Sequence, residues 1–300
     1  MKTNATSIRD IKLNNGVHLP ALGLGVFQSP PEQTVDAVTT AIAGGYRLID
    51  TAAAYYNEQQ VGEGLRRSGV ARAELFVTTK LWMSDYGYDT ALHAFDRSLR
   101  KLGLEYLDLY LLHWPAPSSW ERTVQSWKAA EKLLADGRVR AIGVSNFTEQ
   151  NLDALAKESR ITPAVNQVEL HPFFNQKALR AVDARRGIVT QSWSPIGGIN
   201  RYFKDKPATQ DPLAHPVITD LATKYGKTAA QVVLRWHLEH GLCAIPKSVR
   251  PARIAENFDV FDFTLTAAEV AAIDALDTGV RGGPDPTLVD TKMFTNTIED

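Results

Sequence analysis

The sequence predicts a (β/α)8 barrel of the TIM type, and three observations support this fold class. Short apolar segments recur along the chain, and segments with helical periodicity separate them. We count eight such strands and seven intervening helices, an alternation that indicates a parallel sheet with helical crossovers. Eight units in about 250 residues fit a closed barrel better than an open sheet.

Each element has a local signal. Residues 8–20 alternate polar and apolar around Asn15-Gly16, which predicts a hairpin with a two-residue turn that plugs the N-terminal end of the barrel. The predicted barrel strands are residues 21–27, 47–52, 75–81, 107–113, 139–146, 164–170, 187–195 and 242–247. Helix starts are predicted from capping boxes, at Ser29 to Glu32, Ser118 to Glu121 and Thr228 to Gln231.

The last part of the chain is expected to complete and cover the barrel. Residues 252–258 and 266–277 are predicted to form helices after strand eight, and a tail rich in Gly and Pro starts at Thr278. The one long irregular stretch, 196–216, is predicted to be a loop after strand seven. No linker or composition shift divides the chain, so residues 1–300 are expected to form a single domain.

Composition excludes several classes of protein. The chain is 44% hydrophobic and 22% charged, with a formal net charge of −1, so it has no global charge footprint for nucleic acid or an anionic membrane. The single cysteine, Cys243, rules out an internal disulfide framework. The N-terminus lacks the apolar core of a signal peptide, and no eighteen apolar residues run together. We expect a soluble, cytoplasmic protein that acts as a monomer.

Polar side chains stand where the predicted strands end, and in such barrels the active site forms at those ends. They lie on strands two, three, four, five, seven and eight: Asp50, Lys80, His113, Asn146, Trp193 and Lys247. Each alone has a structural explanation, such as a turn cap, a surface lysine or a buried histidine. Their convergence on one rim is not explained by packing.

Tyr55 follows Asp50 by five residues and completes a device for proton transfer. A free phenol, with a pKa of about 10, is a poor acid at neutral pH. An ammonium such as Lys80 beside it favours the phenolate, and Asp50 would keep Lys80 protonated and in place. His113 would orient a substrate oxygen. Such a device can protonate a carbonyl oxygen as charge develops on it, and it needs a hydride donor.

These residues resemble a known family, the aldo-keto reductases, and most closely its bacterial branch of 2,5-diketo-D-gluconate reductases. The resemblance covers nearly the whole chain and rests on seven motifs in the family's order: IDTAAAYYNE, TTKLW, LLHWP, GVSNF, QVELHP, SWSPIG and IPKSV with ARIAENF. It implies reduction of aldehydes and ketones by NADPH, with Tyr55 as the acid, Lys80 and Asp50 tuning it, and His113 orienting the carbonyl.

The resemblance also implies a cofactor site. Ser145, Asn146 and Gln167 would hold the nicotinamide carboxamide, and Trp193 would stack on the ring. Further cofactor contacts are implied at Ser194, Pro195, Ile196 and Val249. The 2′-phosphate would contact Lys247, Ser248 and Arg253, and the adenine would lie near Glu256 and Asn257. The position expected for the 2′-phosphate is consistent with a general feature of TIM barrels, in which phosphate sites are common after strands seven and eight, beside a helix N-terminus. No GxGxxG follows a strand, so a Rossmann site is not supported.

Aromatic side chains beside the strand ends are expected to form the substrate pocket, and core packing is the competing explanation: Phe27, Tyr56, Trp82 and Trp114. Met293 and Phe294 are expected to form a lid. Two residues depart from the family pattern. Tyr56 places a second phenol beside the acid, and Arg250 adds a cation near the expected phosphate.

Other functions remain to be weighed. His237 and His240 lie three residues apart at a predicted helix end without the HExxH pattern, so we predict no metal site. A Schiff-base aldolase would use Lys80 as a neutral amine, which Asp50 would oppose by raising the lysine pKa. A non-catalytic, NADPH-binding regulatory barrel would be expected to lack one or more of Asp50, Tyr55, Lys80 and His113, and all four are present.

Overall fold

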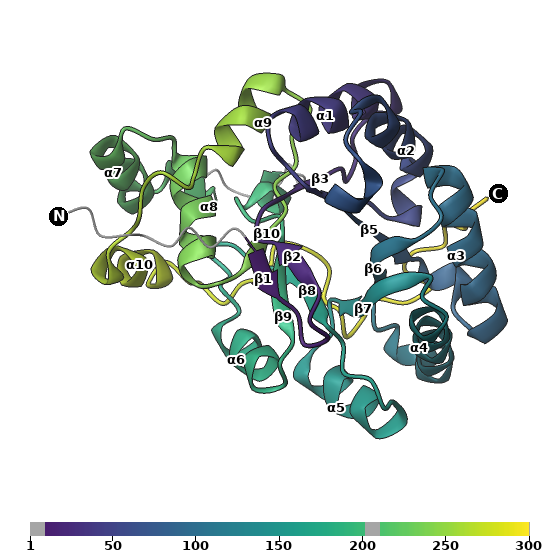
Figure 1. The fold of residues 1–300 in the computed structure, drawn as a ribbon. Coiled ribbons are helices and arrows are strands. Elements are labelled where there is room, and N and C mark those ends of the chain that lie inside the picture. The colour runs from purple at the N-terminus through teal and green to yellow at the C-terminus, as the bar shows by residue number, and fades with distance from the viewer. Residues whose placement is uncertain (1–9, 202–210, 300) are drawn as a thin grey trace.

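The computed structural model describes residues 10–201 and 211–299, and within them a barrel of eight parallel strands forms the centre of the molecule (Figure 1). Its strands pair in chain order: β3 (Gly23–Gly25), β4 (Leu48–Asp50), β5 (Phe76–Leu81), β6 (Leu107–Leu112), β7 (Val139–Ser145), β8 (Val165–Glu169), β9 (Val189–Trp193) and β10 (Cys243–Ala244). The predicted fold class and all eight strand positions are confirmed.

Backbone contacts between the first and last strands close the barrel. The N–H of Ala244 donates to the carbonyl of Ala21 at 3.0 Å, and the N–H of Gly25 donates to that of Pro246 at 3.1 Å. Every residue of β5 and β6 is buried, as expected of parallel strands covered on both faces. One apolar cluster fills the barrel near the hairpin, and a larger one lies between strands and helices.

The predicted hairpin plug is present, but its turn differs from the prediction. Strands β1 (Asp10–Lys12) and β2 (His18–Pro20) pair antiparallel, while residues 8–9 of the predicted hairpin lie outside the described residues. Leu13 and Val17 also bond, so the loop has three residues, with Gly16 at φ 87°. Asn15 Nδ2 donates to the carbonyl of Arg140 at 2.9 Å, which fastens the plug to the start of β7.

Helices form the outer ring in Figure 1. Between β3 and β10 they are α1 (Pro31–Ala43), α2 (Glu58–Arg67), α3 (Tyr88–Leu102), α4 (Trp120–Ala135), α5 (Glu149–Glu158), α6 (Lys177–Arg185), α7 (Pro216–Tyr225) and α8 (Ala229–Glu239). The described residues thus contain eight intervening helices where seven were predicted. The extra one is α7, which begins at the end of the predicted loop 196–216, of which 202–210 lie outside the described residues.

Of the three predicted capping boxes, one is confirmed. Thr228 caps α8 through the N–H of Gln231. Helix α1 instead starts after Pro30 with no side-chain cap, because Pro at the first turn removes donors that would need one. Helix α4 starts after Ser119, also without a side-chain cap, and the Ser118 hydroxyl donates to Asp290 of the tail.

The C-terminal segment crosses the end of the barrel opposite the plug. Helices α9 (Pro251–Phe258) and α10 (Ala267–Asp274) follow β10 as predicted. The tail then returns over the strand ends, where Trp82 Nε1 donates to the carbonyl of Asn296 at 3.0 Å, and it ends beside α3 (Figure 1). The predicted cover over the barrel is confirmed.

Gly62 tests how closely the helical ring is packed. A Cβ at this position in α2 would lie 2.2 Å from the carbonyl oxygen of Leu102, a backbone atom that cannot move aside. Gly62→Ala should lower the free energy of unfolding by about 1–3 kcal/mol, the usual cost of overpacking, as measured by urea denaturation. Gly198→Ala is the control, because its Cβ would meet nothing closer than 3.6 Å. Equal losses in the two variants would contradict the prediction.

Candidate active site

A buried ion pair lies at the carboxyl ends of β4 and β5. Lys80 Nζ donates to Asp50 Oδ1 at 2.5 Å, to the carbonyl of Thr51 at 2.8 Å and to the Tyr55 hydroxyl at 3.4 Å. The Lys80 side chain is 0% exposed and that of Asp50 is 1% exposed. All three ammonium donors therefore have partners. Two of these partners belong to β4 and the residue directly after it, and the third is the Tyr55 hydroxyl.

The short connection after β4 brings Tyr55 back to the ion pair. The chain forms a 3-10 turn, η1 (Ala53–Tyr55), which ends at Tyr56 in the left-handed conformation with φ 55°. Asn57 anchors this turn, because its Nδ2 donates to the carbonyl of Val26 while its Oδ1 accepts from Thr51 Oγ1, both at 2.9 Å. The predicted five-residue step from Asp50 to Tyr55 therefore ends with the phenol on Lys80.

Burial is the largest influence on the charges of the pair. It raises the pKa of Asp50, while Lys80 and a hydrogen bond from Gln167 act to lower it. Burial lowers the pKa of Lys80, and the attraction of Asp50 only partly offsets this. The expectation that Asp50 raises the lysine pKa is thus right for the contribution of Asp50 and wrong for the net direction, because removal from water costs a charged group more than the partner returns.

His113 follows β6 and faces the phenol. Its ring centroid lies 5.7 Å from that of Tyr55 and 5.1 Å from that of Trp82, both in edge-to-face arrangements. Burial and the nearby Lys80 charge hold the pKa of His113 well below its ordinary value of 6.5. The imidazole is therefore neutral at physiological pH, and its one N–H can donate to a substrate oxygen.

Amides from β7, β8 and β9 adjoin the ion pair. Gln167 Nε2 donates to Asp50 Oδ2 and to Gln191 Oε1, each at 2.7 Å. Both of its donors are thereby used, and no hydrogen bond joins its Oε1 to another described residue. The Ser145 hydroxyl donates to the carbonyl of Gln167 at 2.8 Å, and Asn146 Nδ2 donates to that of His113 at 3.0 Å. The predicted carboxamide residues thus lie together beside the predicted acid.

Trp193 ends β9 next to this group. Its Nε1 donates to Asn146 Oδ1 at 2.8 Å, which holds the indole over the strand ends, half-buried. Ser194 follows at φ 52°, and the buried Pro195 accepts a hydrogen bond from His237. His237 also contacts Ser192, and His240 contacts Arg180 and Asp274, so both histidines have partners in the barrel wall.

A second group of predicted residues lies after β10. Lys247 pairs through its backbone with Gly25 and is partly buried, and burial lowers its pKa. Arg253 is exposed in the first turn of α9, and Arg250 stands directly before that helix. None of these three cations forms an ion pair with another described residue. The Glu256 carboxylate accepts from Thr228, and Asn257 is buried.

Aromatic rings surround the mouth of the site. Phe27 packs edge-to-face on Tyr55 at 5.0 Å between centroids. Phe294 of the tail lies 5.8 Å from Trp82 and 6.3 Å from Trp114. The lid expected of Phe294 is thus in contact with the pocket wall, whereas Met293 is 49% exposed.

Comparison with known proteins decides the family. Residues 21–278 match the model of the aldo/keto reductase family. The chain is 61% identical to morphine 6-dehydrogenase of Pseudomonas putida over 95% of this chain and 96% of that protein. It is 49% identical to methylglyoxal reductase DkgA of Escherichia coli K12, over 92% and 96% respectively. A crystal structure of a Gox0644 variant in complex with NADPH superposes with a TM-score of 0.86 at 43% identity, over 94% and 98% of the two chains.

The chain belongs to the aldo/keto reductase family. Tyr56, one of the two residues that depart from the family pattern, contacts the C-terminal tail in this member. The Tyr56 hydroxyl points to the tail, where it accepts from Asn296 Nδ2 at 2.9 Å and donates to the carbonyl of Thr297 at 3.2 Å. Tyr56 is 56% exposed, so it is the outer of the two adjacent phenols.

Three residues of this aldo/keto reductase that adjoin the site were not singled out by sequence reasoning. Asn296 joins Trp82 and Tyr56 across the mouth. Gln191 links Gln167 to Cys243 inside the barrel, and Glu169 is buried at the end of β8. The QVELHP motif contains Glu169 and its partner His171, but two further donors to the carboxylate lie more than a hundred residues away in the tail, so no local pattern reveals them.

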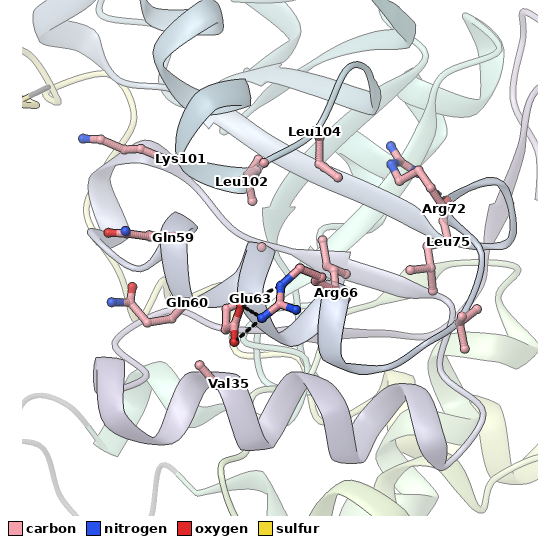
Figure 2. A pocket seen from close by; sticks show the side chains of 14 residues that line it. Val35, Gln59, Gln60, Glu63, Arg66, Arg72, Leu75, Lys101, Leu102 and Leu104 are labelled. Atoms are coloured by element: carbon pink, nitrogen blue, oxygen red, sulfur yellow. Dashed lines mark hydrogen bonds and ion pairs between the residues drawn. The ribbon is translucent and has the colours of Figure 1, made fainter.

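A surface hollow elsewhere on the molecule gives no alternative to this candidate active site, and neither do metal-binding or membrane-spanning features of the described residues. A hollow of about 650 Å³ lies outside the barrel between α1, α2 and α3, where Glu63 bonds to Arg66 (Figure 2). It contains none of the strand-end residues described above. Among the described residues, no cluster of His, Cys, Asp and Glu suited to a metal ion is found, and none of the helices has the length and apolar character to span a bilayer.

The depressed pKa of His113 predicts a pH dependence of stability. As pH falls through 6.5, the unfolded chain binds a proton at His113 that the folded chain does not, so the free energy of unfolding decreases. His113→Asn should flatten this decrease between pH 7 and pH 5, by up to about 1.4 kcal/mol per pH unit. Urea denaturation at the two pH values measures this. His18→Asn, on the exposed face of β2, is the control, and an unchanged slope in His113→Asn would contradict the assignment.

Proposed function

We propose that this aldo/keto reductase reduces aldehydes and ketones to alcohols with NADPH as hydride donor. The observation that carries the proposal is the contact of Tyr55 with a buried Lys80–Asp50 pair beside a neutral His113. The named activity of the Escherichia coli relative and the NADPH complex of a Gox0644 variant support it.

In the proposed mechanism the four side chains share the proton chemistry. The N–H of His113 binds the carbonyl oxygen and orients it. Tyr55 donates its proton to that oxygen as negative charge develops there, and the Lys80 ammonium stabilises the phenolate left behind. Asp50 holds Lys80 in place through its 2.5 Å contact. NADPH, when bound, supplies the hydride.

The residues present fit NADPH. We propose that Gln167, Ser145 and Asn146 hold the carboxamide, since Gln167 Oε1 remains available as an acceptor, and that Trp193 stacks on the ring. Ser194, Pro195, Ile196 and Val249 would line the path toward α9. Lys247, Ser248 and Arg253 would bind the 2′-phosphate, because the cations have no anionic partner among the described residues and adjoin a helix N-terminus. Glu256 and Asn257 would lie near the adenine.

We propose that the substrate enters the aromatic mouth formed by Phe27, Tyr56, Trp82, Trp114 and the tail. Its few charges favour uncharged or small carbonyls such as methylglyoxal and aromatic aldehydes, with 2,5-diketo-D-gluconate as a further candidate. The Pseudomonas putida relative is named for the dehydrogenation of morphine, which is a bulky alcohol. We therefore propose oxidation of such alcohols, the reverse reaction, as a further activity of this chain. Because one chain supplies every proposed group, we propose that the protein acts as a monomer. We also propose that residues 1–300 form one domain and that the protein is located in the reducing cytoplasm.

Two alternatives are less well supported. The lowered pKa of Lys80 would suit a Schiff-base aldolase, but its amine is fully buried with all three donors in use, so no lone pair faces the mouth. A regulatory barrel that binds NADPH without turnover would not need the intact Tyr55–Lys80–Asp50 contacts. Borohydride trapping with a carbonyl substrate would reveal the aldolase, and NADPH binding without consumption would reveal the regulatory barrel.

Replacing the acid tests the mechanism. Tyr55→Phe should lower kcat by about 10²- to 10⁴-fold, the usual contribution of a general acid, while NADPH fluorescence titration shows near wild-type binding. Tyr56→Phe is the matched comparison and should cost far less, since its hydroxyl contacts the tail. Wild-type turnover by Tyr55→Phe, followed as NADPH absorbance, would show that the acid is misassigned.

Replacing the cations tests the cofactor site. Lys247→Ala and Arg253→Ala should each raise the Kd of NADPH by roughly 10- to 100-fold, as expected for a lost charge-assisted phosphate contact, and leave that of NADH nearly unchanged. Arg250→Ala should shift the same preference by a smaller factor. Lys157→Ala, on the exposed surface of α5, is the control. Equal effects on NADPH and NADH would rule out a 2′-phosphate contact.

A further inference from the structure

Glu169 is a buried carboxylate that the proposed proton chemistry does not use. It is the last residue of β8 and is 0% exposed. Two successive backbone donors of the tail bind it: the N–H of Gly282 reaches Oε1 at 2.6 Å, and the N–H of Gly283 reaches Oε2 at 2.9 Å. Since an unpaired buried carboxylate is costly, the two N–H donors of the tail help to stabilise this one.

Two more groups complete the contact. His171 Nε2 lies 3.1 Å from Glu169 Oε1, and Arg281 approaches Oε2 at 3.7 Å with its guanidinium 4.8 Å above the Phe174 ring. Burial would raise the pKa of Glu169, but the His171 contact and the two glycine N–H groups outweigh it and lower the pKa. The carboxylate is therefore charged when the segment 281–283 is in place. We call this segment the strap.

The strap also packs on Trp193. Glu169 and Trp193 are paired residues on adjacent strands. A Cβ on Gly283 would lie 2.8 Å from the outer carbon of the Trp193 ring and 3.1 Å from Glu169 Oε2, so only glycine fits between them. The pyrrole N–H of the same indole donates to Asn146. Trp193 is thus contacted by Asn146 at its Nε1 and bounded by the strap at the outer end of its six-membered ring.

We propose that Glu169 is a positioning residue: it holds the strap against Trp193 and so fixes the indole face that receives the nicotinamide. The inference rests on the proposed function. It makes the tail part of the cofactor site as well as a wall of the substrate mouth. By linkage, if strap closure favours NADPH binding, NADPH must favour strap closure by the same factor.

The strap carries its own reporter. Trypsin cleaves after Arg and Lys, and the bond between Arg281 and Gly282 lies inside the strap, where cleavage requires its release from Glu169. The rate of this cut is followed by mass spectrometry with and without NADPH. NADPH should slow the cut in the wild-type chain.

Two variants open the strap in different ways. Glu169→Gln places an amide donor against backbone donors, and Gly283→Ala keeps the carboxylate but forces a methyl group onto Trp193. Each should raise the Kd of NADPH about tenfold, a loss of about 1.4 kcal/mol, speed the Arg281 cut and weaken its protection by NADPH. Ser118→Ala is the control, because it removes an exposed tail contact with Asp290 far from Trp193 in the chain. It should retain wild-type Kd and kcat.

The outcomes separate the two proposals. A wild-type chain that neither binds nor consumes NADPH overturns the proposed function and this inference with it. If the wild type is active and both variants are cut faster yet keep the wild-type Kd and kcat, the strap is only structural and the positioning role of Glu169 is wrong. If Glu169→Gln does not fold, Gly283→Ala decides, since it retains the Glu169 carboxylate and its contact with His171.

Discussion

The buried contact between Lys80 and Asp50 is the interaction around which the rest of the site is arranged. Two opposite charges at 2.5 Å, both buried, gain little net stability, because each pays for its removal from solvent. Their value is positional. A lysine with every donor in use has one orientation, and that orientation places a positive charge on the Tyr55 hydroxyl. The closed sheet is what makes this geometry rigid, since β4 and β5 cannot move independently within it.

Around that pair the barrel arranges two further layers. The amides of Gln167 and Gln191 extend the hydrogen bonds of Asp50 across the interior to Cys243. The aromatic rings and the tail line the mouth beside the pair. The tail therefore forms part of the site's wall without supplying a proposed catalytic group.

Most of the fold could be predicted because it follows from local rules. Alternating apolar strands and periodic helices imply parallel pairing, and this prediction placed all eight strands correctly. The errors occurred where two local signals compete. Ser29 and Ser118 have the spacing of capping residues, yet prolines and a tail contact changed the helix starts. Helix α7 was missed because the stretch before it is polar and rich in proline.

By itself the sequence determined the order of elements and the residues at the strand ends, since both depend on neighbours in the chain. It also predicted that Asp50, Tyr55, Lys80 and His113 lie together, because the strand ends of a barrel converge. Tertiary structure alone decided the net pKa direction of Lys80, the hydrogen bonds of Gln191, and the grip of Glu169 on Gly282 and Gly283. These depend on burial and on partners more than a hundred residues apart, and neither quantity is written in any local pattern.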